Sequence, residues 1–173
     1  MSTENAKPSL FERLIVPHLD ASYNLAHWLS RSGPDAEDIV QEAYLRAYRH
    51  FDTFTGENGR AWILAIVRNT YLTWQGRQKG ESVMFDESTH RADSTLANPE
   101  QEVLRKAEIG CLRSCIASIP IEHREILIMR ELEELSYKEI ANVASIPIGT
   151  VMSRLSRARK LLHACMTKRE GAK

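Results

Sequence analysis

Residues 136–163 restrict the fold of this chain more than any other segment. Ser136 and Glu139 stand in the S-x-x-E relation of a capping box, which predicts the start of a short helix. Pro147 suits the first turn of a second helix, where the missing N–H of proline costs nothing. The apolar residues of that second helix recur at spacings of four, three and four and form one stripe: Val151, Leu155, Ala158 and Leu162. The segment therefore predicts two helices joined by a short turn at 145–148.

The other side of the second predicted helix is basic. Residues 150–169 contain six Lys and Arg and no Asp or Glu. These proportions are typical of a helix-turn-helix, which places its second helix in the major groove of DNA. Ser153 and Ser156 are small enough for close approach, and arginines can bind guanine edges or phosphates. A basic helix face that is merely solvated is the alternative interpretation.

Upstream patterns also predict helices. Residues 34–51 have acids in the first turn and Arg46 and Arg49 in the last, an order that suits the helix dipole. Their apolar residues recur at helical spacing: Ile39, Val40, Ala43, Ala47, Tyr48 and Phe51. Residues 61–74 are strongly apolar and lack a turn signal, which favours a helix, and the glycines of 52–60 predict a loop.

The pattern changes at residues 77–100, which are polar apart from an apolar cluster at Val83, Met84 and Phe85. Helical periodicity returns after Pro99, with a broad apolar face made of Val103, Leu104, Ala107, Cys111, Leu112, Cys115 and Ile116. No segment pairs convincingly as strands. The sequence therefore predicts an all-α fold of two small helical domains, 9–76 and 101–167, joined by a flexible polar linker at 77–100.

Charge is unevenly distributed although the net charge is zero. Residues 1–100 carry a net −4 and residues 101–173 a net +4. This asymmetry suggests a polyanion as partner of the second half and a basic partner for the first. The longest apolar run, 61–67, is far shorter than the roughly 20 residues that span a bilayer, so no membrane insertion is expected. Three cysteines and no export signal fit a reducing compartment better than a disulfide framework, and we expect a cytoplasmic protein.

Three segments, in order and covering nearly the whole chain, resemble one protein family. SYKEIANVASIPIGTVMSRLSRARKLL looks like the C-terminal promoter-reading domain of bacterial sigma factors of the extracytoplasmic-function (ECF) group. DAEDIVQEAYLRAYRHFDTF and RAWILAIVRNTYLTW look like the N-terminal domain of the same group. The resemblance implies an alternative sigma factor that binds RNA polymerase core and directs promoter-specific initiation for a stress- or signal-responsive regulon. It also implies that an anti-sigma factor restrains the protein. No cofactor, metal or catalytic residue is expected from the resemblance.

The resemblance further implies three sets of contact residues. The surface for the polymerase clamp would comprise Asp35, Asp38, Gln41, Glu42 and Arg46. The single strand of the minus-ten element would be held by His50, Phe54, Thr55, Gly56, Arg60, Arg68 and Asn69. The minus-thirty-five duplex would be read by Thr150, Met152, Ser153, Arg154, Ser156, Arg157, Arg159 and Lys160.

Some of these roles have alternatives. Phe54 would equally serve as a core anchor for its loop, and Glu37 and Asp38 would also complement the helix dipole. Met152 departs from the family, because this position is basic in many members. A thioether cannot donate a hydrogen bond to guanine, so we expect an apolar contact there, for example with a thymine methyl.

Four other classes of protein compete with this interpretation. A repressor would need a dimer interface or ligand pocket in 9–76, where the sequence has an acidic helix and a Gly-rich loop instead. A metal or redox sensor would use Cys111, Cys115, His163 and Cys165, although cysteines on an apolar stripe are ordinary core residues. An enzyme is disfavoured because the histidines are scattered and no phosphate loop or nucleophile motif occurs. A helical adaptor would leave the clustered arginines without a use.

Overall fold

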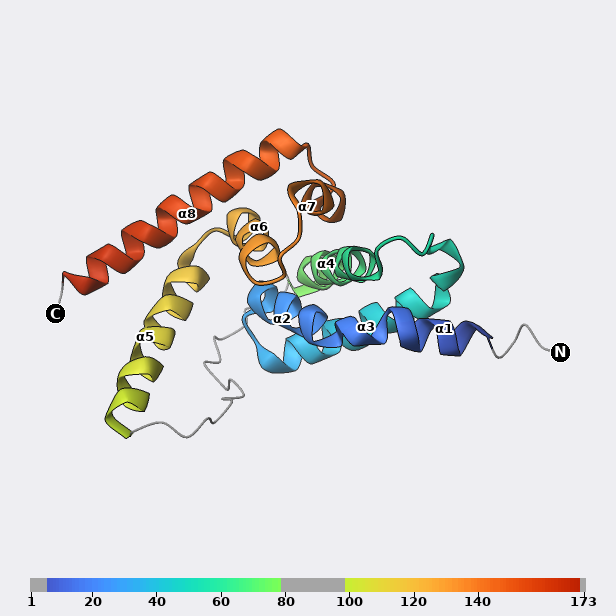
Figure 1. Ribbon diagram of the computed structural model, residues 1–173, viewed down its shortest axis with the longest axis horizontal. Helices are drawn as coiled ribbons and strands as arrows, with labels where there is room; N and C mark the ends of the chain where they lie inside the picture. Colours follow the sequence, from blue (N-terminus) through green and yellow to red (C-terminus); the bar gives the residue numbers. More distant parts are fainter. Residues whose placement is uncertain (1–5, 79–98, 172–173) are drawn as a thin grey trace.

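The computed structural model describes residues 6–78 and 99–171, and all regular structure within these ranges is helical (Figure 1). The helices are α1 (Ala6–Leu14), α2 (Leu19–Ser30), α3 (Gly33–Arg49), α4 (Gly59–Gln78), α5 (Pro99–Ser118), α6 (Ile121–Glu131), α7 (Tyr137–Ala144) and α8 (Ile148–Glu170). Short 3-10 turns, Val16–His18 and Phe51–Thr53, follow α1 and α3. The prediction of an all-α fold is confirmed. Most of the expected linker, with its cluster at 83–85, lies outside the described residues.

Local signals account for several helix ends. The hydroxyl of Ser32 accepts a hydrogen bond from the Asp35 N–H at 3.4 Å and caps α3. The predicted capping box of α7 is confirmed, since Ser136 Oγ accepts from the Glu139 N–H and the Glu139 carboxylate accepts from the Ser136 N–H. Ser145 ends α7 in the left-handed region, at φ 54°. Pro147 is the N-cap of α8, one residue earlier than the first-turn position we expected.

The first half of the chain folds around α2, α3 and α4, which pack on one another. Ile39, Val40, Ala43 and Ala47 turn their side chains into this core, as the spacing predicts. The last two residues of the predicted stripe differ, because Tyr48 is exposed and Phe51 is only half-buried. They meet Phe11 of α1 edge-on instead, each with ring centroids 5.3 Å apart, so α1 covers this end of α3.

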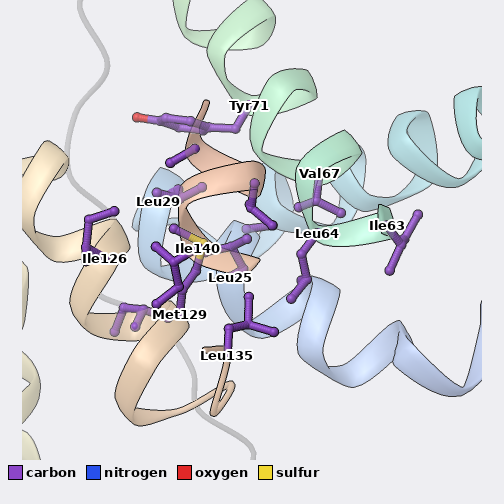
Figure 2. Packing of buried hydrophobic residues seen from close by; sticks show 14 of the residues in the cluster. Leu25, Leu29, Ile63, Leu64, Val67, Tyr71, Ile126, Met129, Leu135 and Ile140 are labelled. Carbon is purple, nitrogen blue, oxygen red and sulfur yellow. The ribbon is translucent and has the colours of Figure 1, made fainter. Parts of the chain in front are cut away.

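The two halves of the chain share one hydrophobic core. Figure 2 shows Leu25 and Leu29 of α2 and Leu64 of α4 beside Met129 of α6 and Ile140 of α7. Helix α6 packs on α2, and α7 packs on α4 (Figure 1). This docking depends on contacts between segments far apart in the sequence, so the sequence alone could not predict it.

Helix α5 corrects one expectation. Its predicted apolar face is buried only near the C-terminal end, at Cys115 and Ile116. Val103 and Leu104 are 68% and 63% exposed, and Leu112 is 39% exposed. In Figure 1 the first half of α5 extends away from α6 and α7, so among the described helices these two leave its apolar face uncovered.

Candidate nucleic-acid interface

Helices α7 and α8 form the predicted helix-turn-helix. The buried stripe of α8, Val151, Leu155 and Ala158, packs against α6 and α7. Leu162, the last residue of the predicted stripe, is half-buried. A backbone hydrogen bond of 3.0 Å from Ile146 N–H to Ala141 O fixes the turn between the two helices. These contacts hold α8 on a rigid support, so that its other side faces outward.

The outward face of α8 carries six of the eight residues expected to read duplex DNA. The exposed members are Met152, Ser153, Ser156, Arg157, Arg159 and Lys160. Thr150 is half-buried, and its carbonyl oxygen accepts a hydrogen bond from Ser153 Oγ at 3.1 Å. Three basic residues and two hydroxyls on one exposed helix face can bind phosphates and base edges together.

Arg154 and Arg159 already have carboxylate partners. Arg159 donates from Nε and Nη2 to Glu131 Oε1, at 3.0 and 2.6 Å. Both side chains of this pair are about half exposed, so the pair contributes little stability. Arg154 Nη1 lies 3.9 Å from Glu125 Oε1, which is the far limit of an ion pair. The contact of Arg154 is longer than a hydrogen bond, and Nη1 of Arg159 takes no part in the pair with Glu131.

The loop between α3 and α4 presents His50, Thr55 and Gly56 to solvent. Gly56 has φ +85°, a conformation that side-chain-bearing residues rarely adopt. Phe54 is half-buried between Phe51 and Trp62, with centroid distances of 5.7 and 5.1 Å. The aromatic ring therefore anchors the loop, as the alternative interpretation of Phe54 proposed.

The start of α4 holds this loop against α1. Asn58 Oδ1 accepts a hydrogen bond from the Ala61 N–H at 3.0 Å, in the position of a helix cap. At Gly59 the backbone passes so close to α1 that an added Cβ would lie 2.5 Å from Leu14 O. The loop is thus positioned by rigid contacts at both of its ends.

Arg60 and Arg68 turn toward the second half of the chain. Arg68 donates to both carboxylate oxygens of Glu125, from Nε at 2.7 Å and from Nη2 at 3.0 Å. Arg60 Nη2 donates to Glu133 Oε2 at 2.7 Å. Burial lowers the pKa of His18, and the nearby cation of Arg60 lowers it further. Asn69, which the resemblance assigns to the same base-binding site as the loop 54–59, is exposed.

Several polar residues of this contact were missed by the sequence analysis. Asn24 Nδ2 donates to Glu133 Oε1 at 2.5 Å, and Asn58 Nδ2 donates to Glu139. Glu125 and Glu133 are each only 4% exposed. No local pattern distinguishes a buried glutamate from a solvated one near the end of a helix, so the sequence offers no cue to these pairs.

The residues expected to face the polymerase clamp lie on one side of α3. Asp38 and Gln41 are exposed, and Asp35 is half-buried in the first turn. Glu42 accepts a hydrogen bond of 2.7 Å from Arg46 Nε, and this bond is the main cause of a lowered pKa for the carboxyl of Glu42. Together with α4, residues of this group line a cavity of about 230 Å³, whose walls include Asp38, Glu42, Arg46, Trp74 and Arg77.

The cysteines contradict the expectation that they fit a reduced protein better than one with a disulfide. Cys115 of α5 and Cys165 of α8 form a disulfide with a Cα–Cα distance of 5.7 Å, so neither offers a thiolate to a metal. Cys111 is half-buried with a free thiol, 3.9 Å from Arg169 Nη1. Among the described residues, no group of three or more His, Cys, Asp and Glu is placed to hold a metal ion. The spacing of 50 residues between the bonded cysteines gives no hint of the pairing, which depends on how α5 and α8 meet.

Over 6–78 and 99–171, no helix combines the length and the hydropathy needed to cross a bilayer.

Comparisons with known proteins agree with the geometry. The family model Sigma-70 region 2 matches residues 14–80, and the model Sigma-70, region 4 matches residues 109–162. An ECF RNA polymerase sigma-E factor of Haemophilus influenzae is 36% identical over 149 residues, which cover 80% of this chain and 77% of that protein. The ECF RNA polymerase sigma-E factor of Escherichia coli K12 is 34% identical over 163 residues, which cover 88% of this chain and 84% of that protein.

Two solved structures are similar as well. The sigma factor RpoE of Bartonella quintana, crystallised with the anti-sigma factor NepR, matches with a TM-score of 0.74 and 25% identity over 91% of this chain and 96% of that one. CnrH, solved in complex with the cytosolic domain of CnrY, matches in fold with a TM-score of 0.64 and 20% identity over 96% of this chain and 91% of that one. The matched regions, the relatives and the helix-turn-helix together place this chain in a family: it belongs to the ECF sigma factors of the sigma-70 family.

Proposed function

We propose that this chain is an alternative sigma factor, which binds RNA polymerase core and directs it to a specific set of promoters. The observation that carries the proposal is the exposed face of α8 in the helix-turn-helix, where Arg157 and Lys160 stand beside Ser153 and Ser156. The segment around them has basic residues but no acid, which suits a polyanion.

Helix α8 reads the minus-thirty-five element in this proposal. Met152, Ser153, Ser156 and Arg157 face base edges, while Thr150, Arg154, Arg159 and Lys160 contact phosphates. The exposed ion pair of Arg159 with Glu131 is weak enough to be exchanged for a phosphate. Met152, 54% exposed, supplies an apolar contact, for which a thymine methyl is the matching base group.

The N-terminal half opens and holds the minus-ten element. His50, Thr55, Gly56 and Asn69 are exposed and can meet an unstacked base, with Phe54 as the wall behind the loop. Arg60 and Arg68 bind the phosphates of the same strand. In the structure both arginines are bonded to carboxylates, so this role requires the two halves to separate first.

The outward side of α3 is the proposed surface for the polymerase clamp. Asp38 and Gln41 are exposed, and Asp35, Glu42 and Arg46 border them. The acids can meet a basic surface, whereas the ion pair between Glu42 and Arg46 fixes the shape of the patch.

The same proposal covers the partners, the cellular location and the domains of the chain. NepR is an anti-sigma factor in complex with the similar RpoE, and we propose that a comparable protein restrains this chain. We further propose that the chain acts in the cytoplasm, where core polymerase is found. The N-terminal domain is 9–76, the C-terminal domain is 101–167, and the chain itself is no enzyme and uses no cofactor.

In vitro transcription tests the proposal. Purified chain and bacterial core polymerase are incubated with pooled genomic fragments, and transcripts are quantified. Two variants are compared with the parent: Arg157→Ala, and the double variant Asp38→Ala with Gln41→Ala. Each should reduce the amount of core-dependent transcript at least tenfold, which corresponds to a loss of about 1.4 kcal/mol of binding free energy. Lys168→Ala is the matched control, because this residue is an exposed cation on α8 outside the proposed DNA contacts. Absence of core-dependent transcripts, with all proteins folded by circular dichroism, would overturn the proposal.

A further inference from the structure

A cavity of about 460 Å³ lies between the residue that follows α2, the end of α5 and the start of α6. We call it the arginine cavity, after Arg31 and Arg124 in its walls. Cavities of this size are typical of small-molecule sites. The residues that line it are distinct from those proposed above to contact DNA and core polymerase.

The charge in the arginine cavity is positive. Arg31 is exposed, whereas Arg124 in the first turn of α6 is only 4% exposed. Burial lowers the pKa of Arg124, and the nearby cation of Arg31 lowers it further. Among the described residues, neither Asp nor Glu lines the cavity. The two cations repel each other, so an anion bound between them would be attracted to both.

Arg124 has hydrogen-bonding capacity that the fold does not use. Its Nη1 donates to Ala117 O at 2.8 Å, near the end of α5, and this bond fixes the guanidinium in the cavity wall. Its Nε is buried and has no hydrogen-bond partner. A buried donor without a partner costs free energy, above all on a charged group. A bound oxyanion would supply the missing acceptor, because the guanidinium fork matches the spacing of its oxygens.

The start of α6 adds backbone donors. Pro120 is the N-cap and makes no side-chain cap hydrogen bond, and its carbonyl accepts from the N–H groups of His123 and Arg124. The N–H groups of Ile121 and Glu122 lie too early in the helix for an intrahelical acceptor. Such groups and the helix dipole favour an anion. The Glu122 side chain is exposed and does not line the cavity.

From these features we propose that the arginine cavity binds a phosphate group, either as free phosphate or as part of a small organic molecule. Arg31 and Arg124 supply the charge, and the start of α6 and the hydroxyl of Ser114 supply further donors. The volume leaves room for an organic part beside the phosphate. Binding at this site requires none of the DNA or polymerase contacts proposed above.

Calorimetric titration of the full chain tests the site with two probes, inorganic phosphate and adenosine monophosphate, in a buffer with physiological chloride. Each probe should bind at a single site. Arg31→Gln removes the exposed cation of the cavity and should weaken the binding of both probes at least about tenfold. Arg105→Gln removes an exposed cation of α5 that does not line the cavity, and this matched control should stay within about twofold of the parent.

The Nε–H group of Arg124 gives a second readout, in a proton–nitrogen correlation spectrum of the parent protein assigned through the bonds of each side chain. Saturating phosphate should shift this signal, because the Nε–H gains an acceptor. The Nε–H signal of Arg105 should stay in place. This readout needs no substitution at the buried Arg124, so it does not depend on the folding of a variant.

The two probes distinguish the two sources of phosphate. Tighter binding of adenosine monophosphate would identify an organic phosphate as the ligand, and equal or weaker binding would identify free phosphate.

Three results would overturn the proposal. The first is that neither probe binds saturably. The second is that Arg31→Gln and Arg105→Gln weaken binding equally, which would indicate general attraction to surface charge. The third is an unchanged Arg124 Nε–H signal at saturation. None of these measurements involves core polymerase, so each of these results would leave the proposed function standing.

Discussion

Arg68 of α4 and Glu125 of α6 are 57 residues apart in the sequence, yet they form a bidentate ion pair with N–O distances of 2.7 and 3.0 Å. Both side chains are largely buried, at 14% and 5% exposure. Apolar residues of α2, α4, α6 and α7 also pack together in the contact between the two halves (Figure 2). The contact between the two halves is thus both apolar and ionic, and its ionic part uses residues that the family resemblance assigns to DNA.

Leu64 tests the importance of the shared core. Its side chain is fully buried, so Leu64→Ala should lower the free energy of unfolding by about 2–5 kcal/mol through lost burial and a cavity. Leu72 lies on the same helix at 42% exposure, and Leu72→Ala should change stability by less than about 0.5 kcal/mol. Urea unfolding followed by circular dichroism measures both. Equal effects of the two substitutions would contradict the packing.

Gly59 tests the close approach of α4 to α1. Gly59→Ala should destabilise the chain by about 1–3 kcal/mol, because the new Cβ would lie 2.5 Å from a backbone oxygen that cannot rotate away. Gly76 is in the same helix with open space around it, and Gly76→Ala should stabilise by about 0.4–1 kcal/mol. Thermal melts of the two variants should therefore move in opposite directions. A stabilising Gly59→Ala would refute this arrangement of α1.

The disulfide between α5 and α8 predicts a redox-dependent stability. Removal of the cross-link by Cys115→Ser should lower the free energy of unfolding by about 2–4 kcal/mol, since it closes a long loop. Cys111→Ser, which changes the neighbouring free thiol on the same helix, is the control and should leave the oxidised protein close to the parent. Thiol titration of the oxidised parent should find one free cysteine. Three titratable thiols under these conditions would contradict the pairing.

Glu139 predicts an acid-sensitive contribution to stability. The pKa of this carboxyl lies below its usual value of 4.5, mainly because the carboxylate accepts a hydrogen bond from the Ser136 N–H. The Ser136 side chain, Asn58 and the cation of Arg60 lower this pKa further. A carboxyl with a lowered native pKa stabilises the fold fully above its unfolded pKa and loses this effect as the pH falls through the native value. The urea midpoint should therefore fall as the pH drops below about 4.5, and the fall should be smaller in Glu139→Gln. An identical pH profile in parent and variant would argue against the role of this carboxylate.

Much of the local structure could be predicted from the sequence, because it depends on neighbours along the chain. The helix at 33–49, the capping box of Ser136 and Glu139 and the apolar stripe of α8 all follow from spacing and capping. The exposure of Val103 and Leu104 could not be predicted in this way. The spacing of apolar residues shows that one face of a helix is apolar, but it does not show whether another element covers that face. The docking of the two halves, the carboxylate partners of Arg60 and Arg68 and the disulfide all depend on contacts between distant segments.

The central claim, that this ECF sigma factor directs polymerase to promoters, is tested most directly by sequencing the 5′ ends of transcripts made by core polymerase with and without the chain on pooled genomic fragments. The account predicts new starts that appear only with the chain and that share two upstream motifs at a fixed spacing. It further predicts that Arg157→Ala weakens the selection of the upstream motif only. Starts without a shared motif, or starts unchanged by addition of the chain, would contradict it.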